Sequence, residues 1–226
     1  LKIKHHKVFL DRKNFLSNLK NLVKHHDAPV YTITYYVHWL LMKAFKDNDF
    51  KISLSGTAAD ELFSGYYDHH NFYLASLYES NKEKFKNALD FWKMTTQNIV
   101  RNPFLQNPKI FIETPENRNH ITLGSDDFKK MINNTNEFLF TDKLYSNQIL
   151  RNRMLNEIFH ETVPVILHED DCNAMYYSIE NRSPFLDRRL FEFCSSIPDE
   201  HLVNNGVSKY ILREAMSCLL YTSPSP

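Results

Sequence analysis

The segment 50–67 constrains the fold of this chain most, because it combines a strand pattern, a glycine turn and an acidic helix start. Phe50 to Ser55 alternates apolar and polar side chains, as a half-buried strand does. Gly56 follows at once, and Ala59 to Phe63 begins a helix near Asp60. A strand that turns into a helix in this way is typical of nucleotide sites in α/β proteins. It also occurs as a plain connection, whose acidic residues only complement the helix dipole.

The residue types in this segment suit a phosphate ligand. The chain has only four glycines in 226 residues, so each one marks a candidate position where a side chain would obstruct the backbone. Gly56 would let the backbone approach a ligand, and the small Thr57 and Ala58 leave room beside it. Amide groups at the helix start can hold an anion. Asp60 is placed to bind Mg²⁺ on a phosphate chain.

Composition excludes several classes of protein. The chain is 42% hydrophobic and 14% aromatic, which is enough to build a core. Lys plus Arg equals Asp plus Glu at 27 each, so no charge bias points to nucleic acid. No apolar stretch approaches the roughly 20 residues that span a membrane. Three cysteines without paired spacing favour a reducing, cytoplasmic compartment and small-molecule substrates.

The remaining pattern is mostly helical. We expect a strand at His6–Leu10 and then a helix that is capped by Asp11. Further helices are expected over Thr34–Lys46, 71–100, Asp142–Thr162, Asp171–Asn181 and Ser208–Met216. Pro164 is expected to interrupt one helix, and Asp187 to cap the helix that follows it. Residues 101–125 should be loop with one short extended piece.

Three segments carry a family resemblance. Ser53 to Tyr67 resembles the Ser-Gly-x-Gly-Ala-Asp-Glu-Leu-Phe-Gly-Gly-Tyr signature of asparagine synthetases. Ile179 to Asp187 is similar to the family's Glu-x-Arg-x-Pro-Phe-Leu-Asp, and Gly206 to Met216 to its Gly-x-x-Lys-x-x-Leu-Arg-Glu. The three occur in the family's order, and together they are far more specific than any one of them.

The resemblance implies a fold and an activity. The fold would be α/β, mostly helical, with a short parallel sheet of the adenine-nucleotide hydrolase type. The enzyme class would be a glutamine-hydrolysing asparagine synthase, a carbon–nitrogen ligase. Such enzymes use ATP and Mg²⁺ to convert aspartate to β-aspartyl-AMP and pyrophosphate. Ammonia released from glutamine then displaces AMP and gives asparagine. The resemblance also allows a homodimer of the full-length enzyme.

The resemblance assigns roles residue by residue. Ser55, Gly56 and Thr57 stand at positions that contact the nucleotide, and Asp60 at a Mg²⁺ ligand. Lys209 matches the lysine that neutralises the departing pyrophosphate, a role suited to a positioned ammonium.

Three further residues have two interpretations each. Asp170 and Asp171 are candidates for a catalytic or substrate-orienting acid, with helix capping as the alternative. Arg182 is a candidate nucleotide contact, with a structural ion pair to Asp187 as the alternative.

The sequence also departs from the family. Thr57 and Ala58 stand where Glu and Gly are frequent, and Thr57 cannot act as a carboxylate base. His168 and Cys172 replace arginines of the family pattern. These changes leave two alternatives open. One is a related synthetase that amidates or cyclises another carboxylate, such as a surface-polysaccharide sugar acid or a peptide. The other is a non-catalytic relative.

Several family parts are absent from the 226 residues. A Ser-Gly-Gly-x-Asp-Ser pyrophosphate loop and the glutaminase domain are expected upstream of Leu1, and the sheet should therefore show an unpaired edge. We assign 1–216 to a partial synthetase domain and 217–226 to a tail that does not resemble the family. Without the loop, these residues alone should have no synthetase activity.

Adjacent histidines invite a metal site, but neighbouring side chains diverge, so His5-His6, His25-His26 and His69-His70 are poor chelates. His69 and His70 follow the nucleotide motif and are instead candidates to line its cleft.

Overall fold

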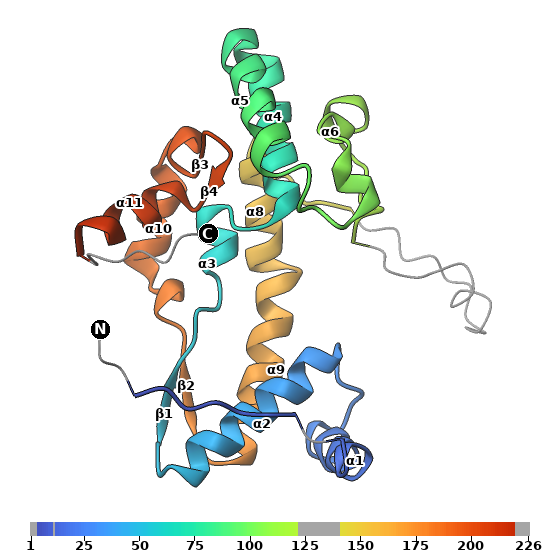
Figure 1. Ribbon diagram of the computed structural model, residues 1–226, viewed down its shortest axis with the longest axis vertical. Coiled ribbons are helices and arrows are strands. Elements are labelled where there is room, and N and C mark those ends of the chain that lie inside the picture. The colour runs from blue at the N-terminus through green and yellow to red at the C-terminus, as the bar shows by residue number, and fades with distance from the viewer. Residues whose placement is uncertain (1–3, 11, 122–140, 220–226) are drawn as a thin grey trace, which may run out of the picture. The chain divides into compact units, whose positions relative to one another are not determined.

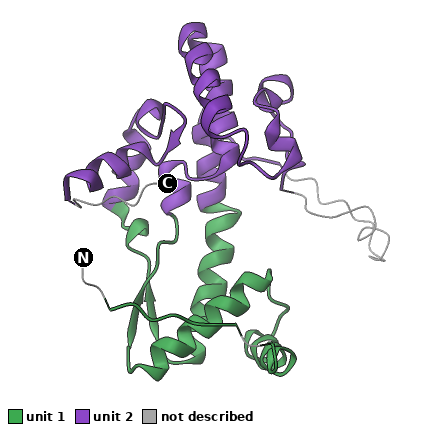
Figure 2. Cartoon of the chain, viewed as in Figure 1, with its two compact units in different colours: residues 1–58, 159–188 green, residues 59–158, 189–226 purple. Residues whose placement is uncertain are grey.

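The computed structural model describes residues 4–10, 12–121 and 141–219, and the chain divides into two compact units (Figures 1 and 2). Unit 1 joins Leu1–Ala58 to Phe159–Arg188, and unit 2 joins Ala59–Ile158 to Arg189–Pro226. The first family segment crosses from unit 1 into unit 2 between Ala58 and Ala59. No helix in the described part of the chain is long and apolar enough to cross a membrane.

Unit 1 is built on a short parallel sheet flanked by helices (Figure 1). Strand β1 pairs with β2 in the register Ile52↔Glu180, Ser53↔Asn181 and Leu54↔Arg182. Within the described residues, these two strands pair only with each other, which agrees with the expected unpaired edge. The elements of unit 1 are α1 (Phe15–His26), α2 (Ile33–Asp47), β1 (Ile52–Leu54), α9 (Thr162–Tyr176), β2 (Glu180–Arg182) and the 3₁₀ turn η2 (Pro184–Leu186).

Aromatic packing forms the core of unit 1. Helix α2 is apolar nearly all round, and it buries Tyr36 and Trp39 against Leu22 of α1. A second cluster joins Met42 of α2 to Ala174 and Ile179. Helix α2 is therefore covered on more than one side, but it is not largely buried, because Ile33 and Leu41 remain exposed.

Unit 2 is almost wholly helical, with one two-residue antiparallel hairpin, β3–β4. Phe72 of α4 stacks face to face on Phe111 of α6, with ring centroids 3.7 Å apart. The amide of Asn71 donates to the carbonyls of Leu105 and Asn107, which fixes the adjoining turn to α4. The helices of unit 2 are α3 (Ala59–Phe63), α4 (Tyr67–Ser80), α5 (Lys82–Thr95), η1 (Pro103–Gln106), α6 (Ile110–Glu113), α8 (Ile149–Phe159), α10 (Arg188–Ser196), η3 (Asp199–His201) and α11 (Tyr210–Leu219), and its strands are β3 (Val203–Asn204) and β4 (Val207–Ser208).

The coarse expectation of a mostly helical α/β protein with a small parallel sheet is confirmed. Strand β1, helix α3 and the start of α10 directly after Asp187 agree with the sequence pattern. Asp11 and the end of the chain after Leu219 lie outside the described residues.

Other local expectations were wrong. His6–Leu10 is not a strand; Phe9 and Leu10 are exposed, and no described strand pairs with them. The described part of 101–125 contains the helical turns η1 and α6 and no extended strand.

The region 142–181 contains two helices and a strand rather than the two helices expected. Helix α8 begins only at Ile149, and Pro164 lies in the first turn of α9, where the missing N–H costs no helical hydrogen bond. Helix α9 ends at Tyr176, and Glu180–Arg182 is strand β2. Asp170 and Asp171 therefore lie inside α9, and neither caps a helix.

Candidate functional site

A cavity of about 330 Å³ lies in unit 1 where β1 ends. Four of the residues chosen from the sequence line it together: Ser55, Gly56, Thr57 and Asp170. The rest of its wall is mostly apolar and comes from α2 and the two strands: His38, Leu41, Met42, Phe45, Ser53, Leu54 and Asn181. The structure thus brings the turn after β1 and an acid from α9 to one site.

Side-chain hydrogen bonds hold the end of β1 in place. The Ser55 hydroxyl donates to Thr57 Oγ1 at 3.1 Å and lies 3.0 Å from the Ser183 hydroxyl. The Ser55 amide donates to the carbonyl of Arg182 at 2.9 Å, and the Ser53 hydroxyl donates to Asn181 Oδ1 at 2.6 Å. These bonds tie the turn to β2 and the residue that follows it, and so hold this part of the cavity wall in place.

Gly56 is open to the space around it. A Cβ atom added to Gly56 would meet no heavy atom within 4 Å. Packing within the protein therefore does not require glycine there. Close approach of a ligand is a reason for glycine that fits this open space.

His38 was missed by the sequence analysis, although it is the one titratable side chain in an otherwise apolar stretch of α2, Val37–Met42. Its Nδ1 atom lies 2.8 Å from Asp170 Oδ1. The His38 side chain is 35% exposed, whereas that of Asp170 is only 7% exposed. The hydrogen bond to Asp170 raises the pKa of His38 above its ordinary value, against the effect of partial burial.

Asp171 lines a second cavity of unit 1, of about 370 Å³, with Leu167, His168, Asn181 and Ser183. The two cavities share Asn181. The neighbouring acids Asp170 and Asp171 thus line different cavities. Arg182 lines neither cavity; it is exposed and donates to Glu180 Oε1 at 2.8 Å.

Asp60 and Lys209 contact each other in unit 2. Lys209 Nζ lies 2.8 Å from Asp60 Oδ1, and their side chains are 26% and 37% exposed. The backbone amide of Lys209 donates to the carbonyl of Phe63, which attaches the start of α11 to the end of α3. A Cβ atom on Gly65 would lie 1.7 Å from Asp60 Oδ1, so a larger residue there would displace the Asp60 side chain from this position.

Two residues of the signature have a left-handed backbone. Ala58 has φ 73° and Ser64 has φ 62°. These are positions where the resembling family often has glycine, which adopts positive φ without steric cost. Ser64 is fully buried, and its hydroxyl has no hydrogen-bond partner among the described residues. At both positions the chain therefore has a left-handed backbone without glycine.

His69 and His70 are buried in unit 2 and do not line a cleft. His69 Nε2 lies 2.8 Å from Glu157 Oε2, and Asp68 completes a cluster whose candidate ligand atoms all lie within 4.8 Å of one another. Arg153 Nη2, however, lies 3.1 Å from Glu157 Oε1, and Arg153 Nε lies 3.6 Å from Asp68 Oδ2. Because this guanidinium already balances the carboxylates, the cluster fits a buried ion network better than a metal site.

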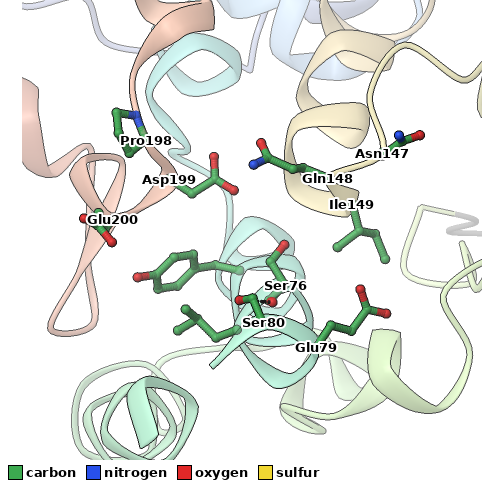
Figure 3. Close-up of a pocket in the computed structure, with 11 residues that line it drawn as sticks. Ser76, Glu79, Ser80, Asn147, Gln148, Ile149, Pro198, Asp199 and Glu200 are labelled. Atoms are coloured by element: carbon green, nitrogen blue, oxygen red, sulfur yellow. Dashed lines mark hydrogen bonds between the residues drawn. The ribbon is translucent and has the colours of Figure 1, made fainter. Parts of the chain in front are cut away.

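The largest cavity found in unit 2, about 440 Å³, contains none of the residues chosen from the sequence (Figure 3). Its wall includes Glu79, Asp199 and Glu200. Asp199 is paired with Arg151 at 2.9 Å, and Glu200 with Lys84 at 2.8 Å. Two of the three carboxylates are therefore already paired within the protein.

Comparison with known proteins identifies the family. The asparagine synthase family model matches residues 1–222. The chain belongs to the asparagine synthase family. It is 28% identical over 218 residues to asparagine synthetase [glutamine-hydrolyzing] 1 of Bacillus subtilis (strain 168), covering 90% of this chain and 33% of that protein. It is 27% identical over 222 residues to asparagine synthetase [glutamine-hydrolyzing] 3 of the same organism, covering 96% of this chain and 31% of that protein.

The chain thus spans about a third of the length of the curated relatives it matches. No solved structure matches it significantly. The family membership agrees with the order of the three sequence segments.

Proposed function

We propose that this chain is the ATP-using part of an amidotransferase, which activates a carboxylate as an acyl-adenylate for attack by ammonia. The observation that carries the proposal is the meeting of Ser55, Gly56, Thr57 and Asp170 at one cavity. A carboxylate is a poor acyl donor, and adenylation gives it a good leaving group. Ser55 and Gly56 would contact the nucleotide beside an open, ordered turn.

Asp60 and Lys209 are assigned to the phosphates by the family resemblance alone. Asp60 is partly exposed and would supply one oxygen ligand to Mg²⁺, which usually takes its other ligands from phosphates and water. Lys209, also partly exposed, would neutralise charge on the departing pyrophosphate. In this arrangement the ion pair between the two side chains holds both in place before ATP binds.

The identity of the carboxylate is a separate part of the proposal. Aspartate is the acceptor that the names of the relatives suggest. Aspartate would bring a second carboxylate, yet neither cavity of unit 1 is lined by a described Lys or Arg. His168 lines the second cavity at a position where the family pattern has arginine. This difference favours the alternative acceptor, a sugar acid or a peptide carboxylate.

Pyrophosphate release tests the proposal. The natural gene product that contains these residues would be incubated with ATP, Mg²⁺, ammonium and a panel of acids: aspartate, uronic acids and short peptides. We expect acid-dependent pyrophosphate release, with Lys209→Ala reducing it by about 10²–10³-fold. A surface lysine variant, Lys86→Ala, is the matched control. Release with none of the acids would contradict the proposal and favour a non-catalytic relative.

A further inference from the structure

His38 is placed for chemistry that the sequence motifs do not assign. It lines the same cavity as Ser55, Thr57 and Asp170. Together with Asp170, it is one of the two ionisable side chains that line that wall. A partly exposed histidine in a cavity wall can exchange protons with a bound molecule, which a fully buried one cannot.

The contact with Asp170 fixes the state of the imidazole ring. Asp170 Oδ1 accepts from Nδ1 at 2.8 Å, which leaves Nε2 as the proton acceptor in the neutral ring. Asp170 is 5% exposed on α9, so its position is set by the helix rather than by solvent. The pair therefore has the order of a general base and the carboxylate that orients it.

Amide formation needs such a base. When an amine nitrogen attacks an acyl-adenylate, a C–N bond forms and the nitrogen gains positive charge. The C–O bond to the phosphate then breaks, and its electron pair leaves with AMP. One proton must leave the nitrogen for the amide to be neutral. Thr57 has no carboxylate to accept it, although glutamate is frequent at this position in the family.

We propose that His38 Nε2 accepts this proton and later releases it to water, with Asp170 as its positioning residue. The inference rests on the proposed function, because it needs an acyl-adenylate at the cavity. It assigns to His38 a step after adenylation, so adenylation itself does not depend on it.

The charged surroundings of His38 are few. From α2, Tyr35 lies with its ring 5.7 Å away, and burial raises its pKa to about 12, so it stays neutral. From α9, Asp170 contacts His38, and Glu169 faces His26 of α1 at 3.4 Å. His168 and Asp171 of the same helix line the other cavity. The residues of β1 and β2 that line the cavity do not titrate. The pH dependence of the step should therefore follow His38 and its contact with Asp170.

Two half-reactions separate this inference from the proposed function. Acid-dependent exchange between ATP and labelled pyrophosphate reports adenylation. Single-turnover amide formation from saturating ammonia, measured at several pH values, reports transfer. Both would be measured on the natural gene product with an acid that supports exchange.

His38→Gln should keep exchange within about twofold and slow transfer by about 10²-fold. Imidazole in the buffer should restore part of the transfer rate of His38→Ala. Asp170→Asn should move the inflection of transfer against pH to lower pH, because the hydrogen bond that raises the pKa of His38 is weakened. His5→Gln, an exposed histidine outside the cavity, is the matched control and should change neither rate.

The outcomes are distinct. Absence of exchange in the unaltered protein with every acid would remove the proposed function, and this inference with it. Normal exchange with normal transfer and an unchanged pH profile in His38→Gln would overturn the role of His38 alone. Loss of exchange in both His38 variants, with an unchanged urea midpoint, would place His38 in adenylation and would also overturn it.

Discussion

Two stretches of the same signature differ in their surroundings. In unit 1, residues 53–57 line a cavity, and His38 faces it with its carboxylate partner. In unit 2, Glu61, Ser64, His69 and most of their neighbours are buried. Near each stretch, but outside the signature, a histidine lies 2.8 Å from a carboxylate; His38 is partly exposed and His69 is fully buried.

The difference separates residues that meet a ligand from residues that hold the fold. A histidine–carboxylate pair beside a cavity can gain and lose a proton at little structural cost. The same pair in the interior is part of a network whose charges must balance, because an unpaired buried charge is strongly unfavourable. The two histidine–carboxylate pairs have the same contact distance, but we expect mutation of the buried pair to lower stability and mutation of the partly exposed pair to leave stability nearly unchanged.

The largest expected effect is loss of stability when the buried network is broken. Glu157→Gln would remove the carboxylate that lies nearest to both His69 and Arg153, and we expect it to lower the free energy of unfolding by about 3–5 kcal/mol. His38→Gln, in the partly exposed pair, should cost no more than about 1 kcal/mol. Urea denaturation followed by circular dichroism measures both. Equal losses in the two variants would show that the pairs do not differ as described.

The second expected effect concerns the pH dependence of stability, to which His70 and His69 contribute in opposite directions. Burial, with the neighbouring charge of His69, lowers the pKa of His70 from 6.5 to about 4. Below pH 6.5 the unfolded chain then binds a proton that the folded protein does not, so stability falls as the pH falls towards 4. The loss reaches about 3 kcal/mol at its largest.

His69 acts in the other direction. Burial opposes its charged form, but Glu157 and Asp68 outweigh burial and raise its pKa. Its contribution is complete below pH 6.5 and is lost as the pH rises through the raised pKa. Urea midpoints between pH 4 and 8 for His70→Gln should show a shallower decline in acid, and His5→Gln should not. An unchanged decline in His70→Gln would mean that His70 is not the group responsible.

The sequence predicted the parts of the site that depend on local pattern. The strand at Ile52–Leu54, the turn at Gly56 and the acidic start of α3 all lie in adjacent residues, and the structure has each of them. The side of the strand that is buried differs from the alternation, because Ser53 is buried whereas Ile52 and Leu54 are exposed. Asp170, chosen as a candidate acid, lines the cavity at this turn, and its alternative as a helix cap was wrong.

What the sequence could not supply depends on contacts between distant residues. Glu180–Arg182 is polar and lacks a strand pattern. It is a strand because it pairs with β1, and the paired residues Ser53 and Asn181 are 128 residues apart in the sequence. His38 belongs to no motif, and only its contact with Asp170 gives it a role. The only sign of this role in the sequence is that His38 is a titratable residue within an otherwise apolar stretch of α2.

The smallest expected effect concerns the missing glycines, and it compares the two units directly. Ser64 and Ala58 both have positive φ, which costs an L-residue roughly 1–2 kcal/mol. Ser64→Gly removes this strain. It also removes a buried hydroxyl that has no hydrogen-bond partner among the described residues, and this removal should add about 1–3 kcal/mol to the free energy of unfolding. Against this stand a greater loss of chain entropy, about 0.4–1 kcal/mol, and the loss of a buried carbon, about 0.8 kcal/mol.

The net expectation for Ser64→Gly is a gain in stability of about 1–2 kcal/mol. Ala58→Gly relieves the same strain but removes only a well-buried methyl group, so its gains and losses nearly cancel. Urea midpoints of the two variants measure the difference. If Ala58→Gly stabilised the protein as much as Ser64→Gly, backbone strain alone would account for the effect. The buried hydroxyl of Ser64 would then have to be satisfied in solution, because its removal would have gained nothing.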